Sequence, residues 1–325
     1  MKNKIISVLL ILIMSLSFTV HANAAPSFWA SEEIKAAISE DLVPKELQKD
    51  YQEPITRAEF CNLAVNLYEN ILNKEIKERK SFIDSNDTNV MKIGGLGIVK
   101  GIENNKFDPE GKLTREQAAV ILSNLSTAMD YSLKNGNHTF IDSKEISKWA
   151  IGDVQKAKAS GIMDGAYDNK FYPKSYYTRE ESIATILRLY DKINLESVTE
   201  EDVYNSIMSL KGKYPNGTPW TNDNFYKWNG GVFSGGYGCA GFAFMLSDEA
   251  FGRAPARKTT DFEDIKIGDI IRLDNDGHSV IVTGINGDII TFAEGNYNSS
   301  VHWGRTETLK EIKETGTYVL TRYPE

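Results

Sequence analysis

The spacing of hydrophobic positions changes along the chain, and each spacing predicts a different kind of structure. An uncharged apolar run covers residues 5–20. From residue 26 to about residue 193, apolar side chains recur three or four positions apart, which predicts amphipathic helices. After residue 264 apolar and polar residues alternate, which predicts short β-strands. The pattern therefore predicts a leader, a helical region, and a region with a sheet.

The first apolar run has the features of a secretory signal. Lys2 and Lys4 precede it, and Ala22-Asn23-Ala24 follows it. This order predicts a signal peptide over residues 1–24. An uncleaved anchor is the alternative, but the run has 16 residues where a membrane-spanning helix needs about 20. We therefore expect a secreted protein without membrane contact after cleavage.

Three copies of one pattern follow the leader. With a constant offset of 64 residues, the later copies share the segments 97–101 and 161–165, Phe107 and Phe171, Pro109 and Pro173, and 114–117 and 178–181. An earlier copy ends at residues 54–59, and the copies occupy residues 26–75, 80–133 and 138–193. Each has a Thr three residues before Glu or Gln, a capping box that predicts a helix start. Units this small cannot bury their apolar faces alone, so the three should pack together.

These copies resemble the S-layer homology (SLH) family, whose mark is an acid and a Trp-Ala on a first helix, then a Gly-rich loop, then a Thr-Arg-Ala-Glu that opens a second helix. The resemblance implies an all-α three-repeat helical bundle that binds secondary cell-wall polysaccharide, often pyruvylated, in grooves between repeats. The implied polysaccharide-binding residues are Arg57, Arg115, Arg179, Trp29 and Trp149. A guanidinium near free helix amides suits a sugar carboxylate, although each arginine could instead only pair with a neighbouring acid.

The three repeats are not equivalent. Repeat two lacks the tryptophan, and repeat one lacks a clear acid before Trp29. We therefore expect one or two of the grooves to be inactive, and we expect Arg179 to be the best binding residue.

The remaining chain, residues 205–325, changes character after an acidic segment at 194–204 that links the regions or opens a helix. Glycines before Cys239 allow a tight turn, and residues 240–251 predict a buried helix. The thiol therefore lies at a helix N-terminus, where the helix dipole favours the thiolate. Strands are predicted at 270–273, 279–285 and 288–294, and residues 316–322 should close the sheet.

This segment resembles the papain-like cell-wall hydrolases of the CHAP and NlpC/P60 group. The motifs that match are Cys239 at a helix start, Gly268-Asp269 before a strand, Gly277-His278 opening the next, and Glu294 with Asn296 one strand later. The resemblance implies an α+β papain-like domain, a helix packed on a small antiparallel sheet or barrel. The Glu-x-Asn pair favours CHAP over NlpC/P60, which more often has a third histidine.

The chemistry of these residue types is that of nucleophilic catalysis. A neighbouring imidazole, His278, converts the thiol of Cys239 into a thiolate that can attack a carbonyl. A third polar group must orient the imidazole, and the sequence leaves Glu294 and Asn296 as alternatives. The Cys239 amide, with Tyr237 as a second candidate, would stabilise the oxyanion.

Other interpretations of the same residues remain open. Cys239 could be an inert buried residue or form a disulfide with Cys61, His278 could be structural, and His302 could be the base. The sequence contains no close His/Cys spacing of the kind that binds zinc, and we expect no metal and no cofactor.

Composition limits the classes of partner. The chain has 37 Lys and Arg against 45 Asp and Glu, a net charge of −8 that disfavours nonspecific binding to nucleic acid. Two cysteines in 325 residues cannot form a disulfide framework.

The function that the sequence predicts is that of a secreted cysteine hydrolase, anchored to the cell wall or S-layer, that cleaves amide bonds of peptidoglycan as an amidase or endopeptidase. The alternatives are a surface-displayed binding protein with an inactive papain-like domain, and a Cys-His enzyme that cross-links proteins. The sequence leaves open which amide bond would be cleaved.

Overall fold

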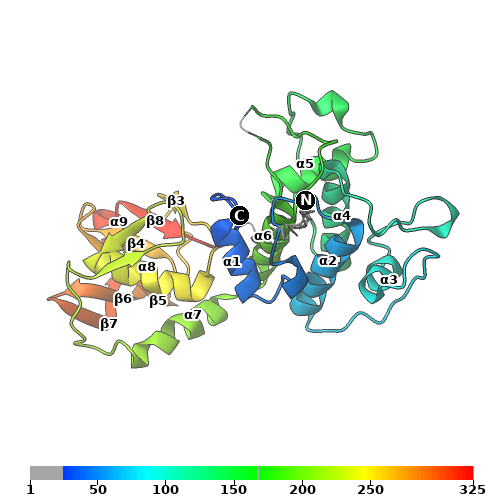
Figure 1. Cartoon of the computed structure of the whole chain (residues 1–325). Coiled ribbons are helices and arrows are strands. Elements are labelled where there is room, and N and C mark those ends of the chain that lie inside the picture. Colours follow the sequence, from blue (N-terminus) through cyan, green and yellow to red (C-terminus); the bar gives the residue numbers. More distant parts are fainter. Residues whose placement is uncertain (1–24, 167, 325) are drawn as a thin grey trace, which may run out of the picture.

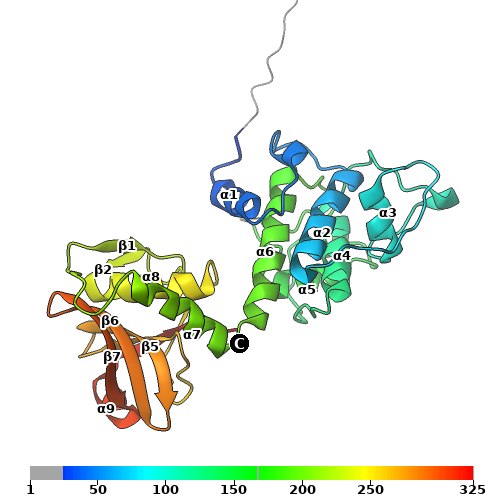
Figure 2. The same cartoon turned by 90° about the horizontal axis from the view of Figure 1, so that it is seen from below.

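The computed structural model describes residues 25–166 and 168–324, so the predicted signal peptide lies outside the described residues. The chain forms two parts. The first is helical, the second contains helices and antiparallel sheets, and the two parts lie side by side (Figures 1 and 2). The helical part contains α1 (Ser31–Ser39), α2 (Arg57–Leu72), α3 (Thr88–Gly95), α4 (Arg115–Ala128), α5 (Ile151–Ala159) and α6 (Arg179–Ser197). Short 3-10 turns cover Lys45–Leu47, Glu103–Asn105, Ser143–Glu145 and, further on, Leu210–Gly212.

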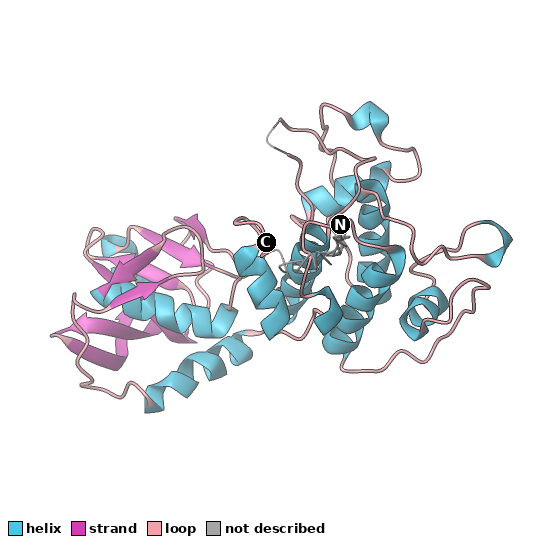
Figure 3. Ribbon diagram, in the orientation of Figure 1, coloured by secondary structure: helices cyan, strands magenta, loops and turns pink. Residues whose placement is uncertain are grey.

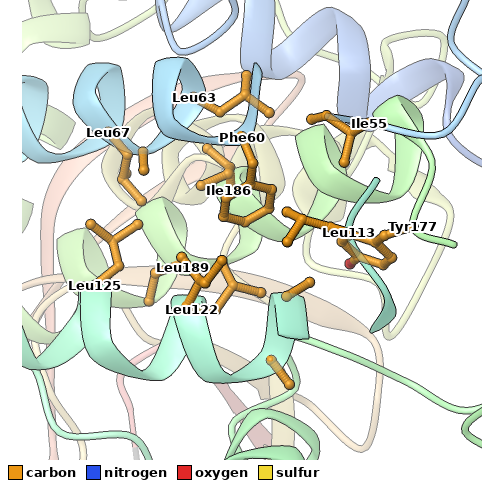
Figure 4. Close-up of a cluster of buried hydrophobic side chains, with 14 of the residues drawn as sticks. Ile55, Phe60, Leu63, Leu67, Leu113, Leu122, Leu125, Tyr177, Ile186 and Leu189 are labelled. Atoms are coloured by element: carbon orange, nitrogen blue, oxygen red, sulfur yellow. The ribbon is translucent and has the colours of Figure 1, made fainter. Parts of the chain in front are cut away.

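The three long helices α2, α4 and α6 begin at the predicted capping boxes. The side chains of Glu59, Gln117 and Glu181 accept hydrogen bonds from the backbone N–H of the threonine three residues earlier, at 2.8, 2.9 and 2.9 Å. These helices pack around one apolar core, to which Phe60, Leu122 and Ile186 each contribute (Figure 4). The predicted helix starts are therefore confirmed at all three positions, and the reciprocal bond from the backbone N–H to the threonine hydroxyl is present at Thr56 and Thr178 but absent at Thr114.

A closed ring of backbone hydrogen bonds joins the segments that precede these helices. The Ile55 N–H donates to Tyr177 O at 2.8 Å, Tyr177 N–H donates to Leu113 O at 2.8 Å, and Leu113 N–H donates to Ile55 O at 3.2 Å. The three side chains are buried at the end of the helical core in Figure 4. Each repeat thus bonds to both of the others.

The segment at 194–204, expected as a linker or as the start of a helix, is helical on both sides of Val198 and Thr199. Helix α6 continues to Ser197, and α7 (Glu200–Ser209) begins with a capping box between Thr199 and Asp202. Acidic residues in the first turn of α7 are favourable because they face the positive end of the helix dipole. Figure 2 shows α6 leading directly into α7 beside the sheet.

The second part is built on a six-stranded antiparallel sheet with strand order β3-β8-β4-β5-β6-β7 (Figure 3). Its strands are β3 (Arg257–Thr259), β4 (Ile270–Leu273), β5 (His278–Asn286), β6 (Ile289–Tyr297), β7 (Ser300–Thr308) and β8 (Tyr318–Thr321). A hairpin of β1 (Phe225–Lys227) and β2 (Gly235–Tyr237) precedes α8 (Gly238–Phe251), and α9 (Leu309–Thr315) precedes β8. Helix α8 packs on β5 and β6, so the predicted helix meets the predicted strands.

The two parts have separate apolar cores and are joined by ion pairs. Buried residues from Ala30 to Leu189 form one cluster, and those from Val203 to Tyr323 form others. Arg253, after α8, contacts Asp191 of α6 at 2.7 Å and Glu40 at 3.2 Å. Within the described residues, none of the helices has the length and apolar character needed to cross a membrane.

Candidate functional sites

Cys239 is the second residue of α8, and the backbone before it has a left-handed conformation that favours glycine. Gly238 has φ +54°, and a Cβ there would lie 2.3 Å from the side-chain oxygen of Asn222. The chain therefore turns sharply from β2 into the helix and leaves Cys239 half-buried as a free thiol.

The surroundings of Cys239 favour its thiolate. Burial opposes ionisation, but hydrogen bonds with His278 and with the backbone N–H of Ser279 overcome this and lower the pKa of Cys239 to about 7. For His278, burial would lower the pKa, but hydrogen bonds with Cys239 and Glu294 raise it to about 9. Because the thiol pKa lies below the imidazole pKa, the two groups form a thiolate–imidazolium pair between those values.

Glu294 is the side chain that orients His278. Its Oε2 lies 2.7 Å from His278 Nε2, which leaves Nδ1 as the ring nitrogen that can face Cys239. The other oxygen, Oε1, accepts a hydrogen bond of 2.8 Å from Arg305 Nε. Burial would raise the pKa of Glu294, but its bonds to His278 and Arg305 lower it, so this fully buried carboxyl is ionised at neutral pH.

Asn296 and Tyr237 lie near the thiol but do not contact His278. The Asn296 side-chain amide donates to Asn222 Oδ1 at 2.8 Å, and both side chains lie against Gly238. Tyr237 is 61 % exposed and its ring contacts that of Phe225. Of the two candidate orienting residues, the structure brings only Glu294 to the imidazole.

The competing residues have other partners, although His302 lies opposite Glu294 on the neighbouring strand. His302 Nε2 contacts Ser300 Oγ at 3.1 Å, and its ring packs against Tyr297. Cys61 is buried in the helical core, where burial raises the pKa of its thiol far above the ordinary value, and it is free rather than bonded to Cys239.

The three motif arginines hold the repeats together in a common way. Arg57 Nε donates to Phe107 O at 2.8 Å, and Arg115 Nε donates to Phe171 O at 2.9 Å, so each binds the loop of the following repeat. Arg179 donates to Lys49 O at 3.4 Å, which closes the cycle. These hydrogen bonds occupy some of the N–H groups of each guanidinium and connect one repeat to another.

The arginines differ in their acidic partners. Arg115 pairs with Glu181, and Arg179 pairs with Glu59, in each case the capping-box acid of the next long helix. For Arg57 the corresponding residue is Gln117, which has no charge. Among the described residues Arg57 forms no ion pair within 4.0 Å, and the acids that act on its charge, Asp108 and Asp84, lie farther from it than that.

The two tryptophans are placed by equivalent contacts. A serine lies two residues before each tryptophan and donates two hydrogen bonds to a buried glutamate. Ser27 bonds Glu180 on the first turn of α6, and Ser147 bonds Glu116 on the first turn of α4. Trp29 and Trp149 are 51 % and 57 % exposed. Trp29 and Arg115 line a cavity of about 470 Å³ together with Tyr172 and Tyr176.

Several residues of these sites were missed by the sequence reasoning. Arg305 and Asn222 reach the candidate active site from β7 and from the loop before β1, and neither belongs to a motif quoted above. The strand that carries Arg305 could have been found, because Val301 and Trp303 are buried and alternate with polar residues.

Comparison with known proteins supports the first resemblance. A family model of the S-layer homology domain matches residues 85–119 and 139–181, within the second and third repeats. The chain is thereby an extracellular protein associated with the cell wall or S-layer.

Relatives match only in part. A stretch of 171 residues, 50 % of this chain, is 32 % identical to 9 % of the amylopullulanase of Thermoanaerobacterium thermosulfurigenes. Exoglucanase XynX of Acetivibrio thermocellus is 30 % identical over 173 residues, 51 % of this chain and 16 % of that protein. The cellulosome-anchoring protein of the same organism is 31 % identical over 127 residues, 37 % of this chain and 28 % of that protein. The chain thus spans less than a third of each of these relatives.

Among solved structures, "The crystal structure of Ly7917" covers 38 % of this chain and 62 % of that chain, with 15 % identity and a TM-score of 0.26. A likeness this weak does not define a shared fold.

Proposed function

We propose that the protein is a wall-bound cysteine hydrolase that cleaves amide bonds of peptidoglycan. The observation that carries the proposal is the set Cys239–His278–Glu294, in which a half-buried thiol at a helix N-terminus has a pKa of about 7 and its imidazole contacts a buried carboxylate. This is the arrangement that nucleophilic amide hydrolysis requires.

The reaction follows from these groups in two steps. The Cys239 thiolate attacks the amide carbon, and the backbone N–H at the start of α8 stabilises the oxyanion. The C–N bond then breaks, the leaving nitrogen takes the proton of His278, and an acyl-thioester remains. His278 next takes a proton from water, which attacks the thioester, releases the carboxylic acid and restores the thiol. Glu294 keeps the ring oriented throughout and stabilises its charged form.

The test is digestion of purified peptidoglycan, followed by mass spectrometry of the fragments and assay of the amines released. The full chain should release amines, and Cys239→Ala should abolish release. Cys61→Ala, which changes the other cysteine, is the matched control and should stay active. Full turnover by Cys239→Ala would refute the proposal, and amine loss with new isopeptide bonds would indicate cross-linking instead.

We further propose that the helical part binds an anionic wall polysaccharide and thereby anchors the enzyme. Two sites support this: Arg57, which forms no ion pair within 4.0 Å among the described residues, and the aromatic cavity at Trp29. The N–H groups of Arg57 that are not bonded to Phe107 O and Lys100 O suit a carboxylate, and exposed aromatic rings suit the apolar face of a sugar. The charge distribution makes Arg57 a better candidate than Arg179.

Pelleting with isolated cell walls tests the anchor, in a Cys239→Ala background so that the walls stay intact. Arg57→Gln should reduce the bound fraction most, because it removes the unpaired charge. Arg179→Gln is the matched control, since Glu59 and Asp50 already oppose its charge. Equal binding by Arg57→Gln and the parent would contradict the assignment.

A further inference from the structure

A small cavity opens beside the nucleophile and has no role in the steps above. Its volume is about 200 Å³, and it is lined by Ala240, which follows Cys239, and by Ser279, which follows His278. The apolar walls come from α8, the β1–β2 connection and the sheet: Phe233, Phe244, Ile270, Tyr318 and Leu320. Neither Cys239 nor His278 lines the cavity itself, but the backbone N–H that bonds the Cys239 thiol belongs to the lining residue Ser279.

One wall of this cavity is a guanidinium. Arg272 of β4 donates from Nε to Asp276 Oδ1 at 2.6 Å, from one terminal nitrogen to Ser279 Oγ at 2.7 Å, and from the other to Asp276 O at 2.6 Å. A guanidinium has five N–H groups, so two remain, one on each terminal nitrogen. Two such donors can hold a carboxylate in a fork.

The charge around the cavity is favourable for an anion. Lys258 Nζ lies 3.7 Å from the centre of the Tyr318 ring and adds a second cation at the rim. Asp276 is the one acid that lines the cavity, and it pairs with Arg272 at 2.6 Å; because its side chain is 58 % exposed, solvent screens its charge more than that of Glu59, the 21 % exposed partner of Arg179. Apart from Arg272, Ser279 and Asp276 the lining side chains are apolar or aromatic, and the volume is below the roughly 300 Å³ of typical small-molecule pockets, so the space admits a short side chain rather than a sugar.

We infer that this cavity is a subsite for a short aliphatic amino-acid residue with a free carboxylate, held by Arg272 next to the amide that Cys239 attacks. The inference rests on the proposed hydrolase function and adds its substrate preference: the enzyme selects a peptide position that carries an uncapped carboxylate. Arg272 acts here as a specificity residue.

Alkylation of Cys239 by two small reagents tests the subsite. Iodoacetate and iodoacetamide both react with the thiolate and expel iodide, but only iodoacetate has a carboxylate. Both rates are proportional to the thiolate fraction of Cys239, so their ratio does not depend on it. The rates are measured by mass spectrometry of the peptide that contains Cys239. We expect Arg272→Gln to lower the ratio roughly tenfold, the size of one charged hydrogen-bonding contact.

Lys258→Gln is the matched control, because it removes a rim cation that makes no fork toward the cavity. An equal drop in both variants would show general attraction and overturn the subsite, and so would an unchanged ratio in Arg272→Gln. If neither reagent labels Cys239, the hydrolase proposal fails, and NMR titration decides the subsite separately. In that titration N-acetylalanine should shift signals of cavity residues and its methyl ester should not; equal shifts would overturn the inference.

Discussion

Replacing His278 by alanine should change the reactivity of Cys239 in opposite directions at low and high pH. The imidazole is the main group that lowers the pKa of Cys239 to about 7. Without it the pKa should return to the ordinary value of 9.0 or above, because burial still opposes the thiolate. At pH 7 the thiolate fraction then falls from roughly one half to roughly 1 %.

The rate changes less than the fraction, because a thiolate of lower pKa is a weaker nucleophile. With a Brønsted coefficient of about 0.5, a shift of about two pKa units makes the thiolate of the variant roughly tenfold more reactive. The alkylation rate of His278→Ala should therefore be roughly fivefold lower than that of the parent at pH 7 and roughly tenfold higher at pH 10. The two pH profiles should cross near about pH 8.

The assay is the rate of iodoacetamide labelling of the Cys239 peptide between pH 5 and pH 10. His302→Ala is the matched control, because this second histidine contacts Ser300 and Tyr297 rather than the thiol. Its profile should coincide with that of the parent. If the His278→Ala profile also coincides with the parent, the imidazole does not set the thiol pKa and the reasoning about the site is wrong.

Three further predictions concern the rest of the molecule. Gln117→Glu should give Arg57 an acidic partner and weaken wall pelleting, with unchanged thermal unfolding as the check that the fold is intact. Arg253→Ala should leave the half-buried carboxyl of Asp191 without its partner and loosen the contact between the two parts, seen as a larger radius of gyration by X-ray scattering. Gly238→Ala should destabilise the protein by about 1–2 kcal/mol, measured by denaturant unfolding, because φ +54° is costly for alanine; Gly212→Ala, in open space, should cost less.

Local signals in the sequence were sufficient to predict the positions of many helices and strands. The capping boxes set the starts of α2, α4 and α6, and strands β4, β5, β6 and β8 lie within a few residues of the predicted segments. The predicted strands at 279–285 and 288–294 pair as the antiparallel strands β5 and β6, and the dipeptide Asn286-Gly287 between them is typical of a hairpin turn. These elements depend on neighbours along the chain, which a single sequence displays directly.

Relations between distant residues could not be predicted in the same way. The significance of Gln117 depends on its position opposite Arg57, and only the packing of the repeats shows that this pair corresponds to Arg115 with Glu181. Likewise, Glu294 and Asn296 are equivalent candidates in sequence. They are two residues apart on β6, yet one contacts His278 and the other contacts Asn222.

The ring of hydrogen bonds among Ile55, Leu113 and Tyr177 limits how such a bundle can arise and grow. In a solenoid each repeat contacts only its neighbours, so repeats can be added or removed at the ends. Here the third repeat returns to the first, and the ring has no open end. A fourth copy would have no place in it, and a nascent chain cannot close it until Tyr177 has been synthesised.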